Sequence, residues 1–203
     1  MNKIRMIALA ACMAATLDAA AQEQEIRLFS HRGGRMEHDE NTLSAFQASY
    51  DAGYRGFETD IRMTRDGALV ITHDSSLERT TNGTGTVEEK TEAEIRQLAT
   101  KQGNKMMFLD ELLEFLKGKE GLYVEFEMKT KPEVLYPEER LHAYCDKLYD
   151  AVMAVKPADA TFVFTSGDYR GLRYLQAKHP GVDLLLITSK PCNDETIDLC
   201  KAM

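Results

Sequence analysis

Short apolar runs and longer amphipathic segments alternate along most of this chain, and each kind of segment predicts a different element. Short runs with β-branched and aromatic side chains predict strands. We expect them near residues 26–30, 54–61, 122–128, 161–165 and 182–188. Apolar side chains three and four residues apart predict helices. We expect these near residues 42–52, 109–116, 137–155, 168–177 and 193–203. Strands that alternate with helices predict an α/β fold with parallel strands and helical crossovers.

The stretch after the second predicted strand departs from this alternation. Residues 65–67 (RDG) are a turn signal and the strand-like residues 68–72 follow, so a hairpin is expected here. Residues 75–91 are rich in Thr, Gly, Asn and Ser and predict an excursion outside the main architecture. Thr91-x-x-Glu94 is typical of a capping box at the start of a short helix.

The N-terminal segment, residues 1–21, is typical of an export signal. Lys3 and Arg5 form a basic start, a mostly apolar run follows, and small residues precede an expected cleavage site before Gln22. The apolar run is too short to span a bilayer. Residues around Cys12 also resemble a lipoprotein signal, but plain cleavage is favoured because apolar residues continue beyond this cysteine. We therefore expect export to the periplasm, with lipid anchoring at Cys12 as the alternative.

Composition narrows the class of partner. The formal net charge is −8 at pH 7, which argues against a nucleic-acid surface or an anionic membrane. A small anionic substrate is still compatible, because a local cluster of basic side chains and a metal ion can outweigh the overall charge. Cys145, Cys192 and Cys200 follow the expected signal without metal-type spacing, so no disulfide framework is predicted, although a Cys192–Cys200 bridge is conceivable. Nothing in the sequence indicates an oligomeric state.

Two of the predicted strands carry carboxylates at a period of two. Glu58 and Asp60 share one face of the second strand, and Glu125, Glu127 and Lys129 share one face of the third. A half-exposed strand with a solvated polar face would show the same alternation. In an α/β sheet, however, both faces are covered, and buried carboxylates repel one another unless a cation compensates them. An all-oxygen set of this kind suits Mg²⁺ or Ca²⁺.

Two histidines and an arginine follow apolar runs, where strands are expected to end. His31 and His73 could each be a structural or surface residue. Two imidazoles on either side of a substrate can also serve as general base and general acid near neutral pH. Arg32 is either a surface charge or a bidentate ligand for a phosphate.

Taken in order, these motifs resemble the glycerophosphodiester phosphodiesterase family. No single motif is specific, but their order along the chain is. They are His31-Arg32-Gly33, Glu40-Asn41-Thr42-Leu43 with Ala45-Phe46, Gly56-x-Glu58-x-Asp60, Thr64-Arg65-Asp66-Gly67, Val70 to His73-Asp74, Leu77-x-Arg79-Thr80-Thr81 and Glu127-x-Lys129. Asp39 departs from the pattern, since it stands where the family usually has proline.

The resemblance implies a TIM (β/α) barrel over residues 22–203, with a small insertion at about 63–105 after the second strand. Five barrel strands can be identified, so we expect a barrel that lacks its C-terminal strands. The implied reaction is metal-dependent hydrolysis of a small-molecule phosphodiester, namely a glycerophosphodiester, to glycerol 3-phosphate and an alcohol. Two alternatives are open: a non-catalytic remnant of the family, and a phosphodiesterase that acts on lysophospholipids or sugar phosphodiesters.

The resemblance also implies a role for each candidate side chain. A divalent metal, Ca²⁺ or Mg²⁺, is expected on three carboxylates, acid–base catalysis on two histidines, and phosphate binding on two basic residues. These are Glu58, Asp60 and Glu127 for the metal, His31 and His73 for catalysis, and Arg32 and Lys129 for the phosphate.

Overall fold

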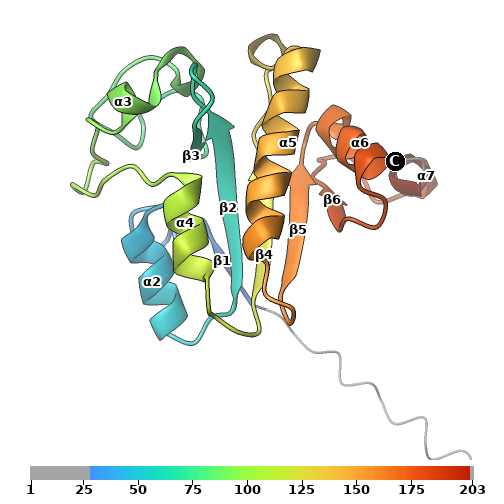
Figure 1. Ribbon diagram of the computed structural model, residues 1–203, viewed down its shortest axis with the longest axis horizontal. Helices are drawn as coiled ribbons and strands as arrows, with labels where there is room; N and C mark the ends of the chain where they lie inside the picture. Colours follow the sequence, from blue (N-terminus) through green and yellow to red (C-terminus); the bar gives the residue numbers. More distant parts are fainter. Residues whose placement is uncertain (1–27, 202–203) are drawn as a thin grey trace, which may run out of the picture.

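A parallel sheet forms the centre of the computed structural model, which describes residues 28–201 (Figure 1). Its strands lie in the order β1-β2-β4-β5-β6, and each neighbouring pair is parallel. Their bounds are Phe29–His31, Gly56–Met63, Tyr123–Met128, Thr161–Ser166 and Leu184–Leu186. The fold is a partial α/β barrel, as predicted. The expected signal at residues 1–21 lies outside the described residues.

Helices α2, α4, α5 and α6 lie on one face of this sheet, and α5 passes in front of β4 in Figure 1. The bounds of the helices are α2 Leu43–Asp51, α4 Leu109–Leu116, α5 Glu138–Val155, α6 Tyr169–Lys178 and α7 Asp194–Lys201. Period-two alternation gives each strand one face that is apolar and lies under the helices. Phe57, Phe126 and Phe164 are 0% exposed there and belong to the main core. Each such burial stabilises the fold by roughly 1.5–3 kcal/mol, and leaves the opposite face of the strand for other side chains.

Local signals in the sequence explain where the helices begin. The Thr42 side chain accepts a hydrogen bond from Ala45 N and caps α2, and Asp168 caps α6 in the same way. Thr91 and Glu94 form both hydrogen bonds of a capping box at the start of α3 (Glu92–Ile95), as predicted.

The stretch after β2 forms the expected excursion. Strand β3 (Leu69–Ile71) pairs antiparallel with β2, and the 3₁₀-helix η1 (Val87–Glu89) and α3 follow. Figure 1 shows this region beside the carboxyl end of β2. It has a small apolar cluster of its own, consisting of Val70, Leu77, Val87, Ile95, Met106 and Phe108. We call residues 63–105 the insertion.

Several element ends differ from the prediction by a few residues. Strand β2 runs to Met63 instead of 61, because its last residues pair with β3. Strand β6 is shorter than predicted, and only Leu184–Leu186 are paired with β5. After β4 a second 3₁₀-helix, η2 (Glu133–Leu135), precedes α5.

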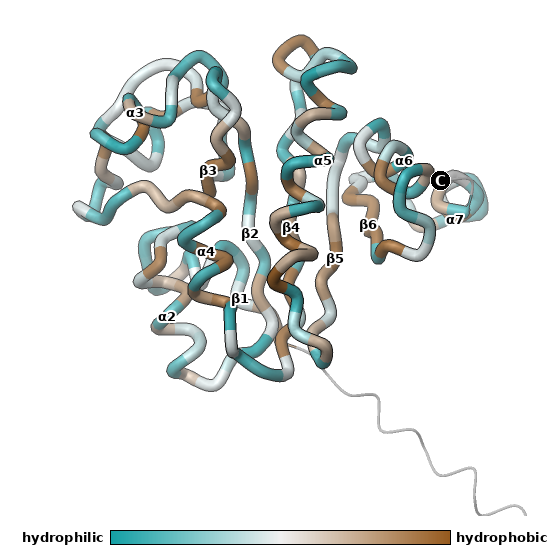
Figure 2. The backbone as a smooth tube through the Cα atoms, viewed as in Figure 1, coloured by the Kyte–Doolittle hydropathy of each residue, from teal (hydrophilic) through white to brown (hydrophobic). Residues whose placement is uncertain are grey.

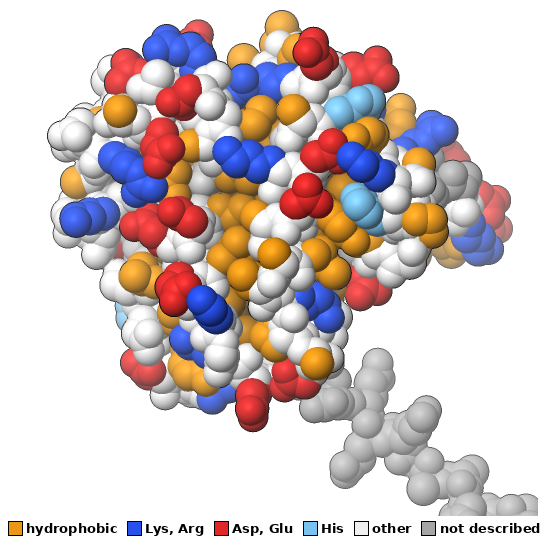
Figure 3. Space-filling model, in the orientation of Figure 1, with side chains coloured by type: hydrophobic (Ala, Val, Ile, Leu, Met, Phe, Trp, Pro, Cys, Tyr) orange, Lys and Arg blue, Asp and Glu red, His pale blue; other side chains and the backbone are white. Residues whose placement is uncertain are grey.

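Hydropathy and charge follow the layers. In Figure 2 much of β4, β5 and β6 is brown, whereas teal polar residues recur along the helices. Figure 3 shows basic and acidic side chains interspersed on the helix-covered face, with apolar atoms visible between the helices. Among the described residues no helix is both long and apolar enough to cross a membrane. Cys145, Cys192 and Cys200 are all free thiols.

Candidate active site

Three carboxylates from neighbouring strands converge on the face of the sheet opposite the helices. Glu58 and Asp60 come from β2 and Glu127 from β4, where the sheet register pairs Asp60 with Glu127. One oxygen of each lies within 4.8 Å of the others. Glu125 is paired with Glu58 in the register and accepts a hydrogen bond from the Tyr123 hydroxyl at 3.2 Å, but it is not part of this cluster. Parallel pairing without a register shift is what brings the three together.

Burial disfavours the ionised form of the carboxylates in this cluster. Asp60 is 0% exposed and Glu58 8% exposed. Burial, and then the charge of Asp60, raise the pKa of Glu58 to about 8. Burial also raises the pKa of Glu127. Carboxylates that are this crowded ionise fully only when a cation joins them.

The free oxygens of these carboxylates fit a divalent cation. One oxygen of Glu58 accepts from the Arg32 backbone N–H at 3.0 Å, and one of Asp60 accepts from Asn41 Nδ2 at 2.9 Å. Glu58 Oε1 is buried without a hydrogen bond, and Asp60 Oδ1 is buried with the Lys129 ammonium 3.2 Å away as its ion-pair partner. Buried polar atoms are rarely left without a hydrogen bond, and carboxylate oxygens are the ligands that Mg²⁺ and Ca²⁺ take. The cluster can therefore hold a metal ion.

The two residues that donate to the carboxylates have an unusual backbone. Arg32 has φ +53° and Asn41 φ +59°, both in the left-handed region that non-glycine residues seldom adopt. Strain of this kind costs of order 1–3 kcal/mol per residue and persists where the surrounding structure enforces it. Here the left-handed turns aim one backbone and one side-chain donor at the cluster.

Two basic side chains border the carboxylates. Lys129 Nζ lies 2.6 Å from Glu127 Oε1 and 3.2 Å from Asp60 Oδ1. Arg32 Nε lies 3.4 Å from Asp60 Oδ2, and it is a buried donor without a hydrogen bond. Both cations offset the local negative charge and leave donors for an anionic ligand. The structure thus brings together the predicted metal and phosphate residues.

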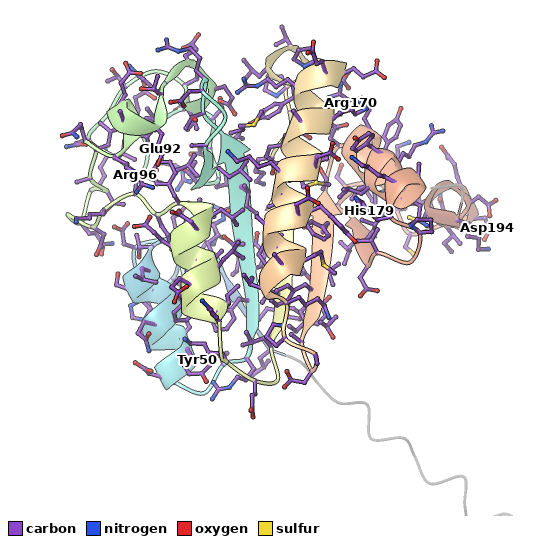
Figure 4. The ribbon with its side chains drawn as sticks, in the orientation of Figure 1. Tyr50, Glu92, Arg96, Arg170, His179 and Asp194 are labelled. Atoms are coloured by element: carbon purple, nitrogen blue, oxygen red, sulfur yellow. The ribbon has the colours of Figure 1, made fainter. Side chains whose placement is uncertain are left out.

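The predicted histidines lie beside the same cluster. His31 ends β1, half of its side chain is exposed, and its Nε2 is 3.6 Å from Glu58 Oε2. Burial of the rest and the charge of Arg32 lower the pKa of His31, and the charge of His73 acts in the same direction. The outlying His179, at the end of α6 (Figure 4), instead stacks on Tyr149 with ring centroids 3.5 Å apart.

His73 is held by a carboxylate. Its Nδ1 lies 2.6 Å from Asp74 Oδ1. Burial opposes ionisation of Asp74, but hydrogen bonds from Arg79 and His73 outweigh it and lower the pKa of Asp74 to about 2. An ionised carboxylate can only accept, so Nδ1 carries a proton and Nε2 is left free for chemistry.

A chain of ion pairs continues from Asp74 back to Arg32. Arg79 donates to Asp74 and makes two hydrogen bonds to Glu40, at 3.0 and 2.7 Å. Glu40 in turn accepts from Arg32 Nη1 at 3.1 Å. No role in the site was predicted for Glu40, Asn41, Asp74 or Arg79. Their only signal was their place in the ordered motifs. Asn41 and Arg79 act on residues distant in sequence, whereas Asp74 bonds its neighbour His73.

A partial α/β barrel with a carboxylate cluster on the strand face opposite the helices defines a barrel protein with a candidate metal site. The Glycerophosphoryl diester phosphodiesterase family matches residues 31–201, and the chain belongs to this family. The predicted resemblance is confirmed.

Curated relatives are similar in sequence, and solved structures share the fold. A glycerophosphodiester phosphodiesterase of Caldanaerobacter subterraneus subsp. tengcongensis is 37% identical over 123 residues, which cover 56% of this chain and 50% of that protein. Among solved structures, a putative glycerophosphoryl diester phosphodiesterase from Silicibacter pomeroyi has a TM-score of 0.75 at 24% identity, covering 86% of this chain and 69% of its own. A phosphodiesterase from Oleispira antarctica has a TM-score of 0.75 at 24% identity, covering 87% and 72%. The chain spans about half the length of the curated relatives that it matches first.

Proposed function

We propose that this protein hydrolyses glycerophosphodiesters to glycerol 3-phosphate and an alcohol, with Mg²⁺ or Ca²⁺ held by Glu58, Asp60 and Glu127. The observation that carries the proposal is the buried carboxylate cluster, in which Glu58 Oε1 has no hydrogen bond although basic side chains border the cluster. Membership of the family supports the choice of substrate class. The solved phosphodiesterase from Oleispira antarctica contains the product sn-glycerol-3-phosphate, which makes this compound a suitable probe.

The basic residues would bind and orient the phosphodiester. Lys129 and Arg32 lie on either side of Asp60 and each has donors directed toward the cluster. A cation bound by the carboxylates would withdraw charge from the phosphoryl oxygens as the diester distorts. The side chains of Arg32 and Lys129 would offset the same charge.

The two histidines would move the protons. The Nδ1–H group of His73 donates to Asp74, so Nε2 is the atom that would accept or donate a proton in the reaction. His31 is neutral over more of the pH range than a free histidine, because its pKa is lowered. One imidazole would take the proton of the attacking oxygen, and the other would protonate the leaving alkoxide.

Release of glycerol 3-phosphate from a glycerophosphodiester, with and without a chelator, tests the proposal. We expect chelator-sensitive release, and a loss of about 10²- to 10⁴-fold in kcat for His31→Ala and for His73→Ala. His142→Ala is the matched control, because that side chain stacks on Tyr174 of α6 away from the cluster. Near-wild-type turnover in either of the first two variants would refute the assignment. A wild-type chain that binds the metal but releases no product would favour a non-catalytic role.

A further inference from the structure

Arg62 is a buried cation whose contacts lie just beyond the metal and phosphate residues. It follows Glu58 and Asp60 at the same period on β2, and only 6% of it is exposed. Its Nε donates to the carbonyl of His73 at 3.0 Å, and its Nη1 lies 3.3 Å from the carbonyl of Lys129. One guanidinium therefore bonds the main chain of the proposed acid–base histidine and of the proposed phosphate ligand.

The charge of Arg62 is balanced by Glu88, which the insertion supplies from η1. Arg62 Nη1 donates to Glu88 Oε1 at 2.7 Å. The same oxygen accepts from the Tyr136 hydroxyl at 3.1 Å, and the other accepts from Ser75 Oγ at 2.8 Å. Glu88 is 6% exposed and Tyr136 0% exposed. The carboxylate is thus fixed by the strand, by the segment that follows His73, and by the segment that follows β4.

A pair of this kind is a poor way to gain stability. Taking two charges out of water costs several kcal/mol for each ion, and well-packed apolar residues of similar volume often serve equally well. Apolar residues, however, have no donors for the carbonyls of His73 and Lys129. A guanidinium can donate to both of these carbonyls at the same time while it pairs with a carboxylate.

We propose that Arg62 and Glu88 are positioning residues that set the places of His73 and Lys129 on the two sides of the carboxylate cluster. This inference rests on the proposed function, since it assumes that these two residues act on a phosphodiester. It gives the insertion a defined part in the reaction. Glu88 pairs with Arg62, and Arg62 bonds the main chain of His73 and of Lys129.

The double variant Arg62→Met/Glu88→Met separates positioning from stability. It removes both charges together, so we expect its melting temperature to lie within about 5 °C of wild type. We expect kcat for a glycerophosphodiester to fall by about 10- to 100-fold, the usual loss when a supporting contact is removed. In a His73→Ala background the same two substitutions should cost less than they do in the wild type, because the part of their effect that acts through His73 is already lost.

Arg140→Met is the matched control. Arg140 Nη2 also donates to two carbonyls at the end of β2, those of Met63 and Thr64, at 2.9 and 3.0 Å. These carbonyls belong to no residue of the site. We expect this variant to lose stability but to keep the wild-type kcat.

If the double variant does not fold, Arg62→Lys and Glu88→Gln replace it. A lysine keeps the charge but presents one ammonium in place of the fork, and glutamine keeps the hydrogen-bonding shape without the charge. We expect both to lower kcat and to weaken the binding of sn-glycerol 3-phosphate, measured by calorimetry in the presence of the metal, more than Arg140→Met does.

The possible results distinguish failure of the positioning role from failure of the proposed function on which it rests. Wild-type kcat in a folded double variant would overturn the positioning role and leave the proposed function intact. An equal loss with and without His73 would overturn the positioning of His73. A wild-type chain that neither hydrolyses the diester nor binds sn-glycerol 3-phosphate would remove the proposed function, and the positioning role with it.

Discussion

Metal-free protein should lose stability as the pH rises from 5.5 to 7.5, and the metal should prevent that loss. The reason is Glu58, whose pKa burial and Asp60 raise from 4.5 to about 8. A carboxyl with a raised folded-state pKa contributes stability that is complete below the unfolded pKa and disappears as the pH rises through the folded one. Each pH unit in this window therefore costs about 1.4 kcal/mol, or about 3 kcal/mol over two units.

Thermal melting in chelator and in excess Mg²⁺ or Ca²⁺ measures this effect. For a chain of this size 3 kcal/mol corresponds to about 5–10 °C in melting temperature. We expect the chelated protein to melt lower by this amount at pH 7.5 than at pH 5.5. The shift caused by the metal should grow over the same interval, because the bound cation favours the ionised carboxylate.

Glu58→Gln isolates the contribution of this one group. A lowered histidine pKa, such as that of His31, has the opposite effect on the dependence of stability on pH. The folded state favours the neutral imidazole, so this group makes the protein more stable as the pH rises. Subtracting the Glu58→Gln curve in chelator removes those other contributions. A wild-type slope equal to that of the variant, or a chelated protein that is most stable at pH 7.5, would refute the argument from burial.

Three further outcomes follow from contacts in the structure. Asp74→Asn should lower kcat by about 10- to 100-fold, because the tautomer of His73 is no longer fixed. It should also lower the melting temperature, because the ion pair with Arg79 is lost; steady-state kinetics and melting check both. Lys129→Met should lower kcat/KM for the diester by about 10- to 100-fold through loss of a charged contact, and an unchanged ratio would contradict the phosphate role. Gly33→Ala should destabilise the fold by roughly 1–3 kcal/mol in urea unfolding, since Gly33 has φ +75° and an added Cβ would lie 2.9 Å from the Phe46 ring.

The sequence was sufficient for the parts of the site that depend on periodicity. Glu58 and Asp60 had to share a face of one strand, and Glu127 lay on a strand expected to be parallel to it. The structure adds the register, Asp60 opposite Glu127, and a one-residue slip would have turned Glu127 to the helix-covered face. Hydrophobic pattern alone does not fix that register before the neighbouring elements are in place.

Contacts between distant segments were beyond prediction. Arg62 lay just after the second predicted strand, and Glu88 lay in residues 75–91, for which only an excursion from the main architecture was predicted. Their pairing depends on how the insertion folds back over the end of β2. The helix start at Thr42 was predictable because a capping side chain acts within one turn of its own helix.

The ion pairs around the cluster have a consequence for the charge state of the loaded site. Five carboxylates and three cations take part in the linked contacts, which leaves two negative charges; they are Glu40, Glu58, Asp60, Asp74 and Glu127 against Arg32, Arg79 and Lys129. One divalent ion cancels those charges, whereas a monovalent ion would leave the site acidic. A singly charged phosphodiester then enters surroundings of zero net charge. One proton, on either histidine, is enough to keep the loaded site neutral.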